Sequence, residues 1–293
     1  MSDIDDLWPH CLALVRQRRG GAAGTDPARL PAAFRWDAQH GLALDDRRWG
    51  EPALQWFTLF KPLLERTAAD VPWVIAQLGQ SLDGFIATHG GDANFVNGEQ
   101  VLLHLHRLRA LCDAVIVGAD TVAIDNPQLT TRRVPGDNPV RVVIDAKLRL
   151  DPALKVFTDG QAPTLLVCDA AQAGAAAERV GTAQVLGVAG LVAADGALDL
   201  RALLAALARI GLRVLFVEGG GVTVSRFVAQ QCADRLHLSV APVVIGDGRP
   251  GLQVPRGTVM RECLRPPARV YPMGNDVLWD LDLRAASAGQ PAA

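Results

Sequence analysis

The stretch Val214-Leu215-Phe216-Val217-Glu218-Gly219-Gly220-Gly221 carries the strongest structural signal in this chain. Its apolar residues predict a buried strand, and its three glycines lead directly into a helical pattern at residues 222–228. Such a turn aims backbone amides and a helix N-terminus at the edge of a sheet, which is a place to bind phosphate. Glu218 adds a carboxylate at the edge where open α/β folds bind ligands. By themselves, these residues are equally consistent with a tight turn and a solvated glutamate.

The composition is that of an ordinary globular protein, with 293 residues and 49% hydrophobic content. Its 29 Lys and Arg against 31 Asp and Glu give a net charge of −2, so no overall field recruits nucleic acid or an anionic membrane. The N-terminus lacks an apolar signal core, and no apolar run is long enough to span a bilayer. The five cysteines form no C-x-x-C pair, which disfavours a disulfide framework. We therefore expect a cytoplasmic protein that binds neither nucleic acid nor membrane.

Three regions are predicted along the chain. Residues 1–70 hold four of the six tryptophans and two helical patterns, the second broken or kinked near Pro62, which indicates a small helical extension of unknown role. Residues 71–285 form an alternating α/β pattern, and residues 286–293 a flexible tail. Strands are expected at 73–78, 114–117, 140–144, 164–167, 184–188, 214–217, 236–240 and 277–283. Helices at about 98–111, 199–209 and 222–231 imply a mostly parallel sheet, and the last two strands an antiparallel edge.

Three further segments place polar or aromatic side chains close to predicted strand ends. Asp83, in the turn Ser81-Leu82-Asp83-Gly84, is by default a turn-stabilising residue and otherwise a candidate catalytic carboxylate. Phe95, on a glycine-rich loop, either stacks on a planar heterocycle or anchors the loop. Thr121 and Asp125 follow the strand at 114–117, with Arg132 close behind. The planar fork of an arginine suits a phosphate.

Other enzyme classes lack their signatures. There is no H-E-x-x-H pair, no G-x-S-x-G elbow and no Walker sequence, so zinc catalysis, serine hydrolysis and P-loop chemistry are not supported. We expect no metal. The glycine turn and the arginines together suggest either two phosphorylated ligands or one dinucleotide with a small substrate, and that combination points to a reductase.

Several short motifs occur in a fixed order along about residues 72–284. They are Gln80-Ser81-Leu82-Asp83-Gly84, Gly91-Asp92, His106-Arg107-Leu108-Arg109, Asp113-Ala114-Val115-Ile116-Val117-Gly118, Thr121-Val122, Asp125-Asn126-Pro127-Gln128-Leu129-Thr130, Pro139-Val140-Arg141-Val142-Val143-Ile144-Asp145 and Val217-Glu218-Gly219-Gly220-Gly221. In this order they resemble the riboflavin-biosynthesis pyrimidine reductases, which are relatives of dihydrofolate reductase. The ordered set is specific, although no single motif is.

The resemblance implies a dihydrofolate-reductase-like α/β fold, often a homodimer, that binds NADPH. The implied reaction reduces the ribosyl group of 5-amino-6-(5-phosphoribosylamino)uracil to a ribityl chain by hydride transfer from the nicotinamide to C1′ of the opened sugar. The enzyme would contribute mainly the alignment of the two bound molecules.

The resemblance also assigns residues. Glu218 and Asp83 are the candidate catalytic residues. The implied substrate contacts are Ala93, Arg109, Leu129, Arg132 and Glu218, with Arg109 and Arg132 as the phosphate clamp. The implied cofactor contacts are Gly79, Phe95, Thr121, Asp125, Gly219, Gly220, Gly221, Val222 and Thr223, within a run that extends to Arg226.

Three positions depart from many bacterial members of this family, which have Lys at Gln77, often Ser at Ala93, and Trp at Phe95. The alternatives are therefore a reductase of a pterin or another modified pyrimidine, or a cofactor-binding module without turnover. The zinc deaminase of bacterial relatives carries H-x-E and P-C-x-x-C, and residues 1–70 have neither, so we expect no deaminase activity.

Overall fold

The computed structural model describes residues 3–20, 29–45, 48–66, 71–93, 96–180, 184–255 and 257–284. The predicted tail at 286–293 lies outside these residues. In the described part of the chain, no helix is both long and apolar enough to cross a membrane.

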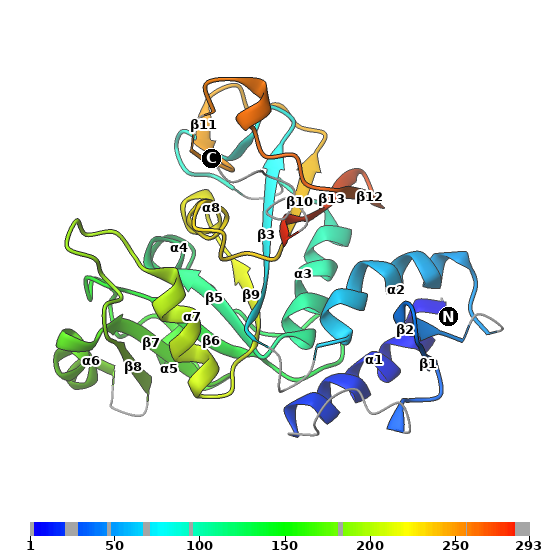
Figure 1. Ribbon diagram of the computed structural model, residues 1–293. Helices are drawn as coiled ribbons and strands as arrows, with labels where there is room; N and C mark the ends of the chain where they lie inside the picture. The colour runs from blue at the N-terminus through cyan, green and yellow to red at the C-terminus, as the bar shows by residue number, and fades with distance from the viewer. Residues whose placement is uncertain are drawn as a thin grey trace.

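A nine-stranded sheet forms the centre of the molecule, in the order β12-β13-β10-β3-β9-β5-β6-β7-β8 (Figure 1). Its strands are β3 (Trp73–Ser81), β5 (Ala114–Gly118), β6 (Val140–Ile144), β7 (Thr164–Asp169), β8 (Val185–Val188), β9 (Val214–Glu218), β10 (Arg235–Ala241), β12 (Ala268–Met273) and β13 (Asp276–Asp282). All neighbours from β10 to β8 are parallel, whereas β13 runs antiparallel to both β10 and β12. The mostly parallel sheet with an antiparallel edge is confirmed.

Helices cover both faces of the sheet. They are α3 (Glu99–Leu111), α4 (Ala119–Asp125), α5 (Lys155–Thr158), α6 (Ala173–Val180), α7 (Leu200–Arg209) and α8 (Gly221–Ala229), with short 3-10 turns at Ala170–Gln172 and Met260–Glu262. Side chains alternate along β9, so Phe216 packs in one core with Leu108 of α3, while Val217 packs in the other with Phe227 of α8. This alternation also decides on which side of the sheet each functional side chain emerges.

The N-terminal extension contains more than the two predicted helices. Between α1 (Asp3–Arg19) and α2 (Glu51–Leu64) lies a hairpin of β1 (Phe34–Asp37) and β2 (Gly41–Leu44). The strands of this hairpin are only four residues long and gave little periodic signal. Of the predicted break or kink near Pro62, the break does not occur, because α2 continues through Pro62 to Leu64. Its last turn is held by the burial of the apolar face, which includes Phe60 and Leu63.

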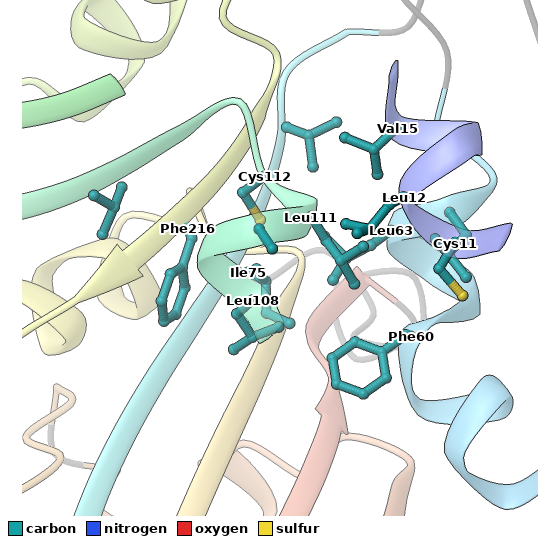
Figure 2. Close-up of a cluster of buried hydrophobic side chains, with 14 of the residues drawn as sticks. Cys11, Leu12, Val15, Phe60, Leu63, Ile75, Leu108, Leu111, Cys112 and Phe216 are labelled. Carbon is teal, nitrogen blue, oxygen red and sulfur yellow. The ribbon is translucent and has the colours of Figure 1, made fainter. Parts of the chain in front are cut away.

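One hydrophobic core joins the extension to the sheet. Leu12, Phe60 and Leu63 of the extension belong to the same buried cluster as Leu111 of α3 and Phe216 of β9 (Figure 2). Buried polar contacts reinforce this junction. Arg18 at the end of α1 donates to the carbonyls of Leu63 and Leu111 at 3.2 and 2.7 Å, and pairs with Asp113 at 2.9 Å. The C-terminal ends of α2 and α3 are thereby tied to α1.

A small two-stranded ribbon stands above the carboxyl edge of the sheet. After the Asp83 turn, β4 (Phe85–Thr88) pairs antiparallel with β11 (Gly248–Pro250). The partner strand comes from far along the chain, so no local pattern could have indicated the pairing.

Candidate active site

A cleft of about 680 Å³ opens beyond the carboxyl ends of β5, β6 and β9. That volume lies within the range of ligand pockets, about 300–1,000 Å³. Its walls come from the β4–β11 ribbon, α4, the segment after β6, and the start of α8. The lining includes the predicted cofactor residues Thr121, Asp125, Gly220, Gly221, Val222 and Thr223.

The glycine turn Gly219–Gly221 lies between the first turn of α4 and the first turn of α8. Gly219 has φ 141°, a backbone conformation that side-chain-bearing residues rarely adopt, and α8 begins immediately afterwards at Gly221. The Gly220 amide donates to Thr121 Oγ1 at 3.1 Å, which fixes the turn against α4. A Cβ at Gly221 would lie 2.3 Å from the carbonyl oxygen of Gly251, so only glycine fits there. The first turn of α8 therefore opens onto the cleft.

The cleft also contains charged residues that sequence reasoning had not assigned. Asp145, Lys147 and Arg149 follow β6, and Arg249 comes from β11. Arg149 pairs with Asp120 at 2.8 Å. Burial raises the pKa of the Asp125 carboxyl, and the charge of Arg249 opposes that shift. The signal for the Asp145–Arg149 segment was present, because it follows a predicted parallel strand, as Thr121 and Glu218 do.

Three of the cleft cations, Lys147, Arg226 and Arg249, have no ion-pair partner among the described residues, and all three side chains are exposed. Arg226 lies one turn into α8, behind the glycine turn. Unpaired cations beside a helix N-terminus make this side of the cleft favourable for phosphate groups.

On the opposite face of the sheet, Glu218 is held by Arg109 of α3. Nε of Arg109 donates to Oε2 of Glu218 at 2.8 Å, and Nη2 donates to Oε1. The third donor, Nη1, reaches the Thr130 carbonyl at 3.0 Å. Both side chains are largely buried, with 7% and 16% of their surfaces exposed. Each of the three guanidinium nitrogens of Arg109 thus donates to a protein acceptor.

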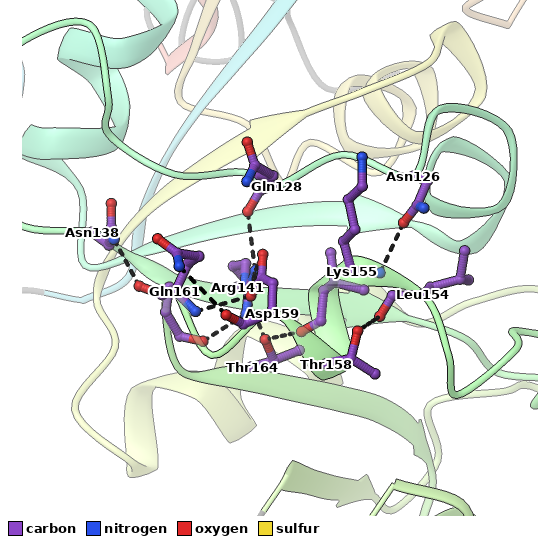
Figure 3. Close-up of polar contacts among 12 residues, drawn as sticks. Asn126, Gln128, Asn138, Arg141, Leu154, Lys155, Thr158, Asp159, Gln161 and Thr164 are labelled. Atoms are coloured by element: carbon purple, nitrogen blue, oxygen red, sulfur yellow. Dashed lines mark hydrogen bonds and ion pairs between the residues drawn. The ribbon is translucent and has the colours of Figure 1, made fainter.

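The segment between α4 and β6 supplies the acceptor for Arg109. Leu129 is 2% exposed and has φ 55°, an uncommon conformation for a bulky residue, and the Thr130 carbonyl that follows it points at Arg109. Just before it, the Gln128 carbonyl accepts from buried Arg141 at 3.1 Å (Figure 3). Leu129 itself packs in the core beneath the site. Its strained backbone is held by these polar contacts.

Arg132 lies next in this segment and presents a different geometry. Its backbone amide donates to His106 Nδ1 at 3.1 Å. Its side chain is exposed, and the described residues offer it no hydrogen-bond acceptor or ion-pair partner. Burial and the positive charges of Arg109 and Arg133 lower its pKa, while Glu218 raises it, so it lies within the field of the Arg109–Glu218 pair. The Arg132 guanidinium is thus an exposed positive charge close to the Arg109–Glu218 ion pair.

His106 is a functional residue that the sequence motif contained but did not explain. It is 3% exposed, and its Nδ1 accepts the Arg132 amide, so the proton of the neutral ring is on Nε2. Burial lowers its pKa to about 3, with further contributions from Arg109, Arg132 and Arg133. His106 and Arg109 are three residues apart on α3, which places both on the side of the helix that faces this segment.

Gln77 lies beside Glu218 in the sheet. β3 and β9 pair Gln77 with Glu218, and β10 pairs Gln77 with His237. Gln77 is 4% exposed, and its Nε2 donates to Ser239 Oγ at 3.3 Å. Gln77 is therefore buried next to the Glu218 carboxylate.

The remaining predicted residues are distributed as follows. Ala93 lines the cleft together with the predicted cofactor residues. Gly79 leaves room for Asn97, whose Oδ1 would lie 1.7 Å from a Cβ at that position. Phe95 lies outside the described residues.

Asp83 occupies the turn between β3 and β4. Its carboxylate accepts from Ser81 Oγ at 2.5 Å, from the Ile245 amide at 3.1 Å and from the Gly246 amide at 2.7 Å. These hydrogen bonds lower its pKa to about 2. The geometry favours the turn-stabilising interpretation of Asp83. Within the described ranges, no group of three or more His, Cys, Asp or Glu could hold a metal ion.

Comparison with known proteins identifies relatives of this arrangement. Residues 72–269 match the sequence profile of the family described as RibD C-terminal domain. The 2,5-diamino-6-ribosylamino-4(3H)-pyrimidinone 5′-phosphate reductase of Methanothermobacter thermautotrophicus is 38% identical over 179 residues, which are 60% of this chain and 80% of that protein. The riboflavin biosynthesis protein RibD of Bacillus amyloliquefaciens is 33% identical over 189 residues, 64% of this chain, and the match spans half of its length.

A solved structure shares the fold. Acinetobacter baumannii RibD superposes with a TM-score of 0.63 at 23% identity, covering 80% of this chain and 64% of that one. At this identity, the likeness shows the fold alone.

Proposed function

The chain belongs to the RibD C-terminal domain family, and from this premise we propose that it is a pyrimidine reductase of riboflavin biosynthesis. The proposed reaction reduces the ribosyl group of 5-amino-6-(5-phosphoribosylamino)uracil to ribityl. One observation supports it most: the fixed Arg109–Glu218 pair and Arg132, which no described residue pairs with, lie at the sheet edge that also borders the cleft. A carboxylate, a phosphate ligand and a dinucleotide-sized cleft are what this reduction needs.

NADPH fits the cleft by its chemistry. The first turn of α8 and the Gly219–Gly221 turn offer backbone donors to a pyrophosphate, and Lys147 and Arg226, which form no ion pair within the described ranges, add positive charge for phosphate groups. Thr121 and Asp125 line the wall between them. When bound, NADPH would supply the hydride that reduces C1′ of the opened sugar. Phe95 and Gly79 stay predicted cofactor contacts.

The chain's own residues orient the substrate. Arg109 holds both oxygens of Glu218, so the carboxylate is fixed before substrate arrives, which is the preorganisation that hydride transfer requires. Every guanidinium nitrogen of Arg109 already donates to Glu218 or to the Thr130 carbonyl. Arg132 is therefore the residue that binds the substrate phosphate, and Arg109 acts chiefly by positioning Glu218. Ala93 and Leu129 complete the substrate contacts in this proposal.

A second substrate has specific support. The Methanothermobacter relative is named for a 2,5-diamino-pyrimidinone 5′-phosphate, and this chain covers 80% of that protein. The two candidate substrates share the ribosylamino phosphate and differ on the pyrimidine ring. Glu218 and Gln77 are the neighbouring polar groups in the sheet that present acceptors and donors to such a ring.

We also propose that the active protein is a homodimer, formed through the antiparallel edge of the sheet. Val270 of β12 and Trp279 of β13 are paired directly, Val277 lies on the same face, and they are 52%, 42% and 37% exposed. A second copy of this chain would cover this apolar face. Sedimentation velocity should give a dimer that Val270→Glu converts to a monomer, while Val71→Glu, at a 69% exposed site outside this face, leaves the dimer intact.

The decisive experiment follows NADPH oxidation with the phosphoribosylamino-uracil, its 2,5-diamino counterpart and a dihydropterin. Turnover of either phosphorylated pyrimidine supports the proposal and identifies the substrate. Turnover of the pterin alone, or NADPH binding without any turnover, would overturn it. Arg132→Ala should raise the KM of the phosphorylated substrate at least about tenfold, since it removes a charged hydrogen bond, and should affect the dephosphorylated form much less. Arg133→Ala is the matched control, because the neighbouring Arg133 is paired with Glu99.

A further inference from the structure

Residues 131–138, here called the phosphate arm, lie between helix α1 of the extension and helix α3. The arm begins with Thr131 and Arg132 and is closed on itself by Asn138, whose Oδ1 accepts the Thr131 amide at 2.7 Å. On the α3 side, His106 accepts the Arg132 amide. The family match begins at residue 72, so helix α1 is no part of it.

Trp8 of α1 reaches the tip of the arm. Its indole Nε1 donates to the Pro135 carbonyl at 2.8 Å across 127 residues of sequence. Trp8 is 5% exposed, and its ring packs edge-on against Trp56 at 5.7 Å, so the donor is held in place by the core of the extension. Because the Trp8 indole is held rigidly, its hydrogen bond fixes the position of the Pro135 carbonyl.

The arm is also packed tightly against α1. A Cβ at Gly136 would lie 2.7 Å from Cβ of Ala110 on α3 and 3.3 Å from Cδ2 of Leu12 on α1. The arm therefore passes between the two helices with no space for a side chain at this point. A displacement of α1 would have to displace the arm.

Charged side chains of α1 also contact the phosphate arm. Arg16 and Arg19 of α1 lie 3.9 and 3.8 Å from Asp137 of the arm. Asp137 is 62% exposed, so these ion pairs contribute little by themselves. Arg19 also donates to the Cys112 carbonyl at the end of α3, which ties the same helix turn to the helix that carries Arg109 and His106.

We propose that helix α1 is a positioning element of the substrate site: through Trp8 and Leu12 it fixes the phosphate arm, and thereby Arg132, relative to Glu218. This inference rests on the proposed function only for the role of Arg132 as phosphate ligand. An extension that served only to enlarge the core would have no need of a directed hydrogen bond to the arm.

The test compares Trp8→Phe with Trp49→Phe in the full-length protein. Both indoles are buried, but among the described residues Trp49 Nε1 has no hydrogen-bond partner, so Trp49→Phe controls for loss of indole volume. For Trp8→Phe we expect a KM for the phosphorylated pyrimidine raised about two- to tenfold, the worth of one neutral hydrogen bond, with kcat and NADPH affinity unchanged. Amide hydrogen exchange at residues 131–138 should accelerate by a similar factor.

Equal exchange and equal KM in the two variants would overturn the inference. The exchange measurement needs no substrate, so it decides the role of α1 even if the wild-type protein reduces neither pyrimidine, an outcome that would instead refute the proposed function. Should Trp8→Phe fail to fold, Leu12→Val takes its place, because it removes the methyl group of α1 that packs on the arm at Gly136 and changes the core little. Faster exchange across the arm then supports the inference, and unchanged exchange overturns it.

Discussion

Glu218 joins the two sides of the proposed site. Its backbone leads into the glycine turn that borders the cleft, whereas its side chain emerges on the face of the sheet covered by α3, where Arg109 holds it. This follows from the two-residue repeat of a strand, because Phe216 and Glu218 share one face and Val217 takes the other. Cofactor and substrate can therefore meet at a strand end without competing for the same side chains.

At the same scale, Lys147 and Arg226 should decide the preference for NADPH over NADH. Both are cations of the cleft with no ion-pair partner in the part of the chain that the structure describes, and the two cofactors differ only by a phosphate group. Arg226→Gln and Lys147→Gln should each raise the KM for NADPH about tenfold and leave the KM for NADH nearly unchanged. Arg149→Gln is the control, since Arg149 is already paired with Asp120. Equal effects on both cofactors would show that neither cation contacts that phosphate.

His106 should make the stability of the protein depend on pH. Its pKa is about 3 in the folded protein and about 6.5 in an unfolded chain. Between these values the unfolded state binds the proton and the folded state does not, so stability is complete above pH 6.5 and falls as the pH drops toward 3. The slope from one histidine is at most about 1.4 kcal/mol per pH unit.

His106→Asn removes this titration and can keep an acceptor for the Arg132 amide. Urea unfolding at pH 7, 6 and 5 should show a shallower loss of stability for His106→Asn, reduced by up to about 1.4 kcal/mol per pH unit. His104 stays in this variant, and since burial lowers its pKa as well, part of the pH dependence should persist. His89→Asn, at an exposed position, should retain the full wild-type slope.

At the scale of elements, α3 organises the substrate side. Arg109 of α3 binds Glu218, and His106 of α3 accepts a hydrogen bond from the phosphate arm. At the C-terminal end of α3, Arg18 donates to the Leu111 carbonyl. The segment from Asn126 to Thr130 is fixed from the other side, where Arg141 and Lys155 donate to Gln128 and Asn126 (Figure 3). The loops of the site are thus held by hydrogen bonds to rigid elements.

Asp83 is expected to act on the β4–β11 ribbon as an element. It anchors residues 245–246, which lead into β11, and β11 contributes Arg249 and Pro250 to the cleft wall. Asp83→Ala should raise the KM for NADPH about two- to fivefold with little change in kcat, and Asp83→Asn, which keeps one acceptor, less. Because its pKa is lowered to about 2, this anchor is intact above pH 4 and is lost only as the pH falls toward 2. Loss of turnover in Asp83→Asn at saturating NADPH would favour the catalytic assignment instead.

At the scale of the whole molecule, the extension and the reductase region share one core. Phe60 is fully buried and its ring lies 4.5 Å from that of Trp56 and 5.3 Å from that of His104 on α3. His104 Nε2 in turn lies 2.9 Å from Nδ1 of His237 on β10, so the extension contacts a buried polar chain that reaches the sheet. Two regions with a common core should unfold together.

Phe60→Ala should therefore lower the stability of the entire protein, by about 3–5 kcal/mol. Tryptophan fluorescence, dominated by the extension, and far-UV circular dichroism, dominated by the sheet and its helices, should report one coincident transition in both proteins. Trp36→Ala, at a 46% exposed aromatic of the same extension, should change stability by less than about 0.5 kcal/mol. An earlier fluorescence transition would show that the extension unfolds independently.

Local sequence patterns were enough for eight of the nine strands of the sheet and for the helices at 98–111, 199–209 and 222–231. Buried parallel strands have continuous apolar runs, and helices repeat every 3.6 residues, so both can be recognised from neighbouring residues. Local patterns did not predict the hairpin at 34–44, the short helix α4 or the exposed strand β12, because short or polar elements carry little periodicity. The pairing of β4 with β11 depends on residues about 160 positions apart.

The sequence by itself determined the α/β architecture, the family and the glycine turn that begins α8, because each depends on residue types in a fixed local order. Only the tertiary structure decided what the polar residues do. It paired Arg109 with Glu218, left Arg132 without a partner among the described residues, and placed Trp8 against the phosphate arm. A side chain's role depends on its burial and on partners from distant elements, and neither is encoded in its immediate neighbours.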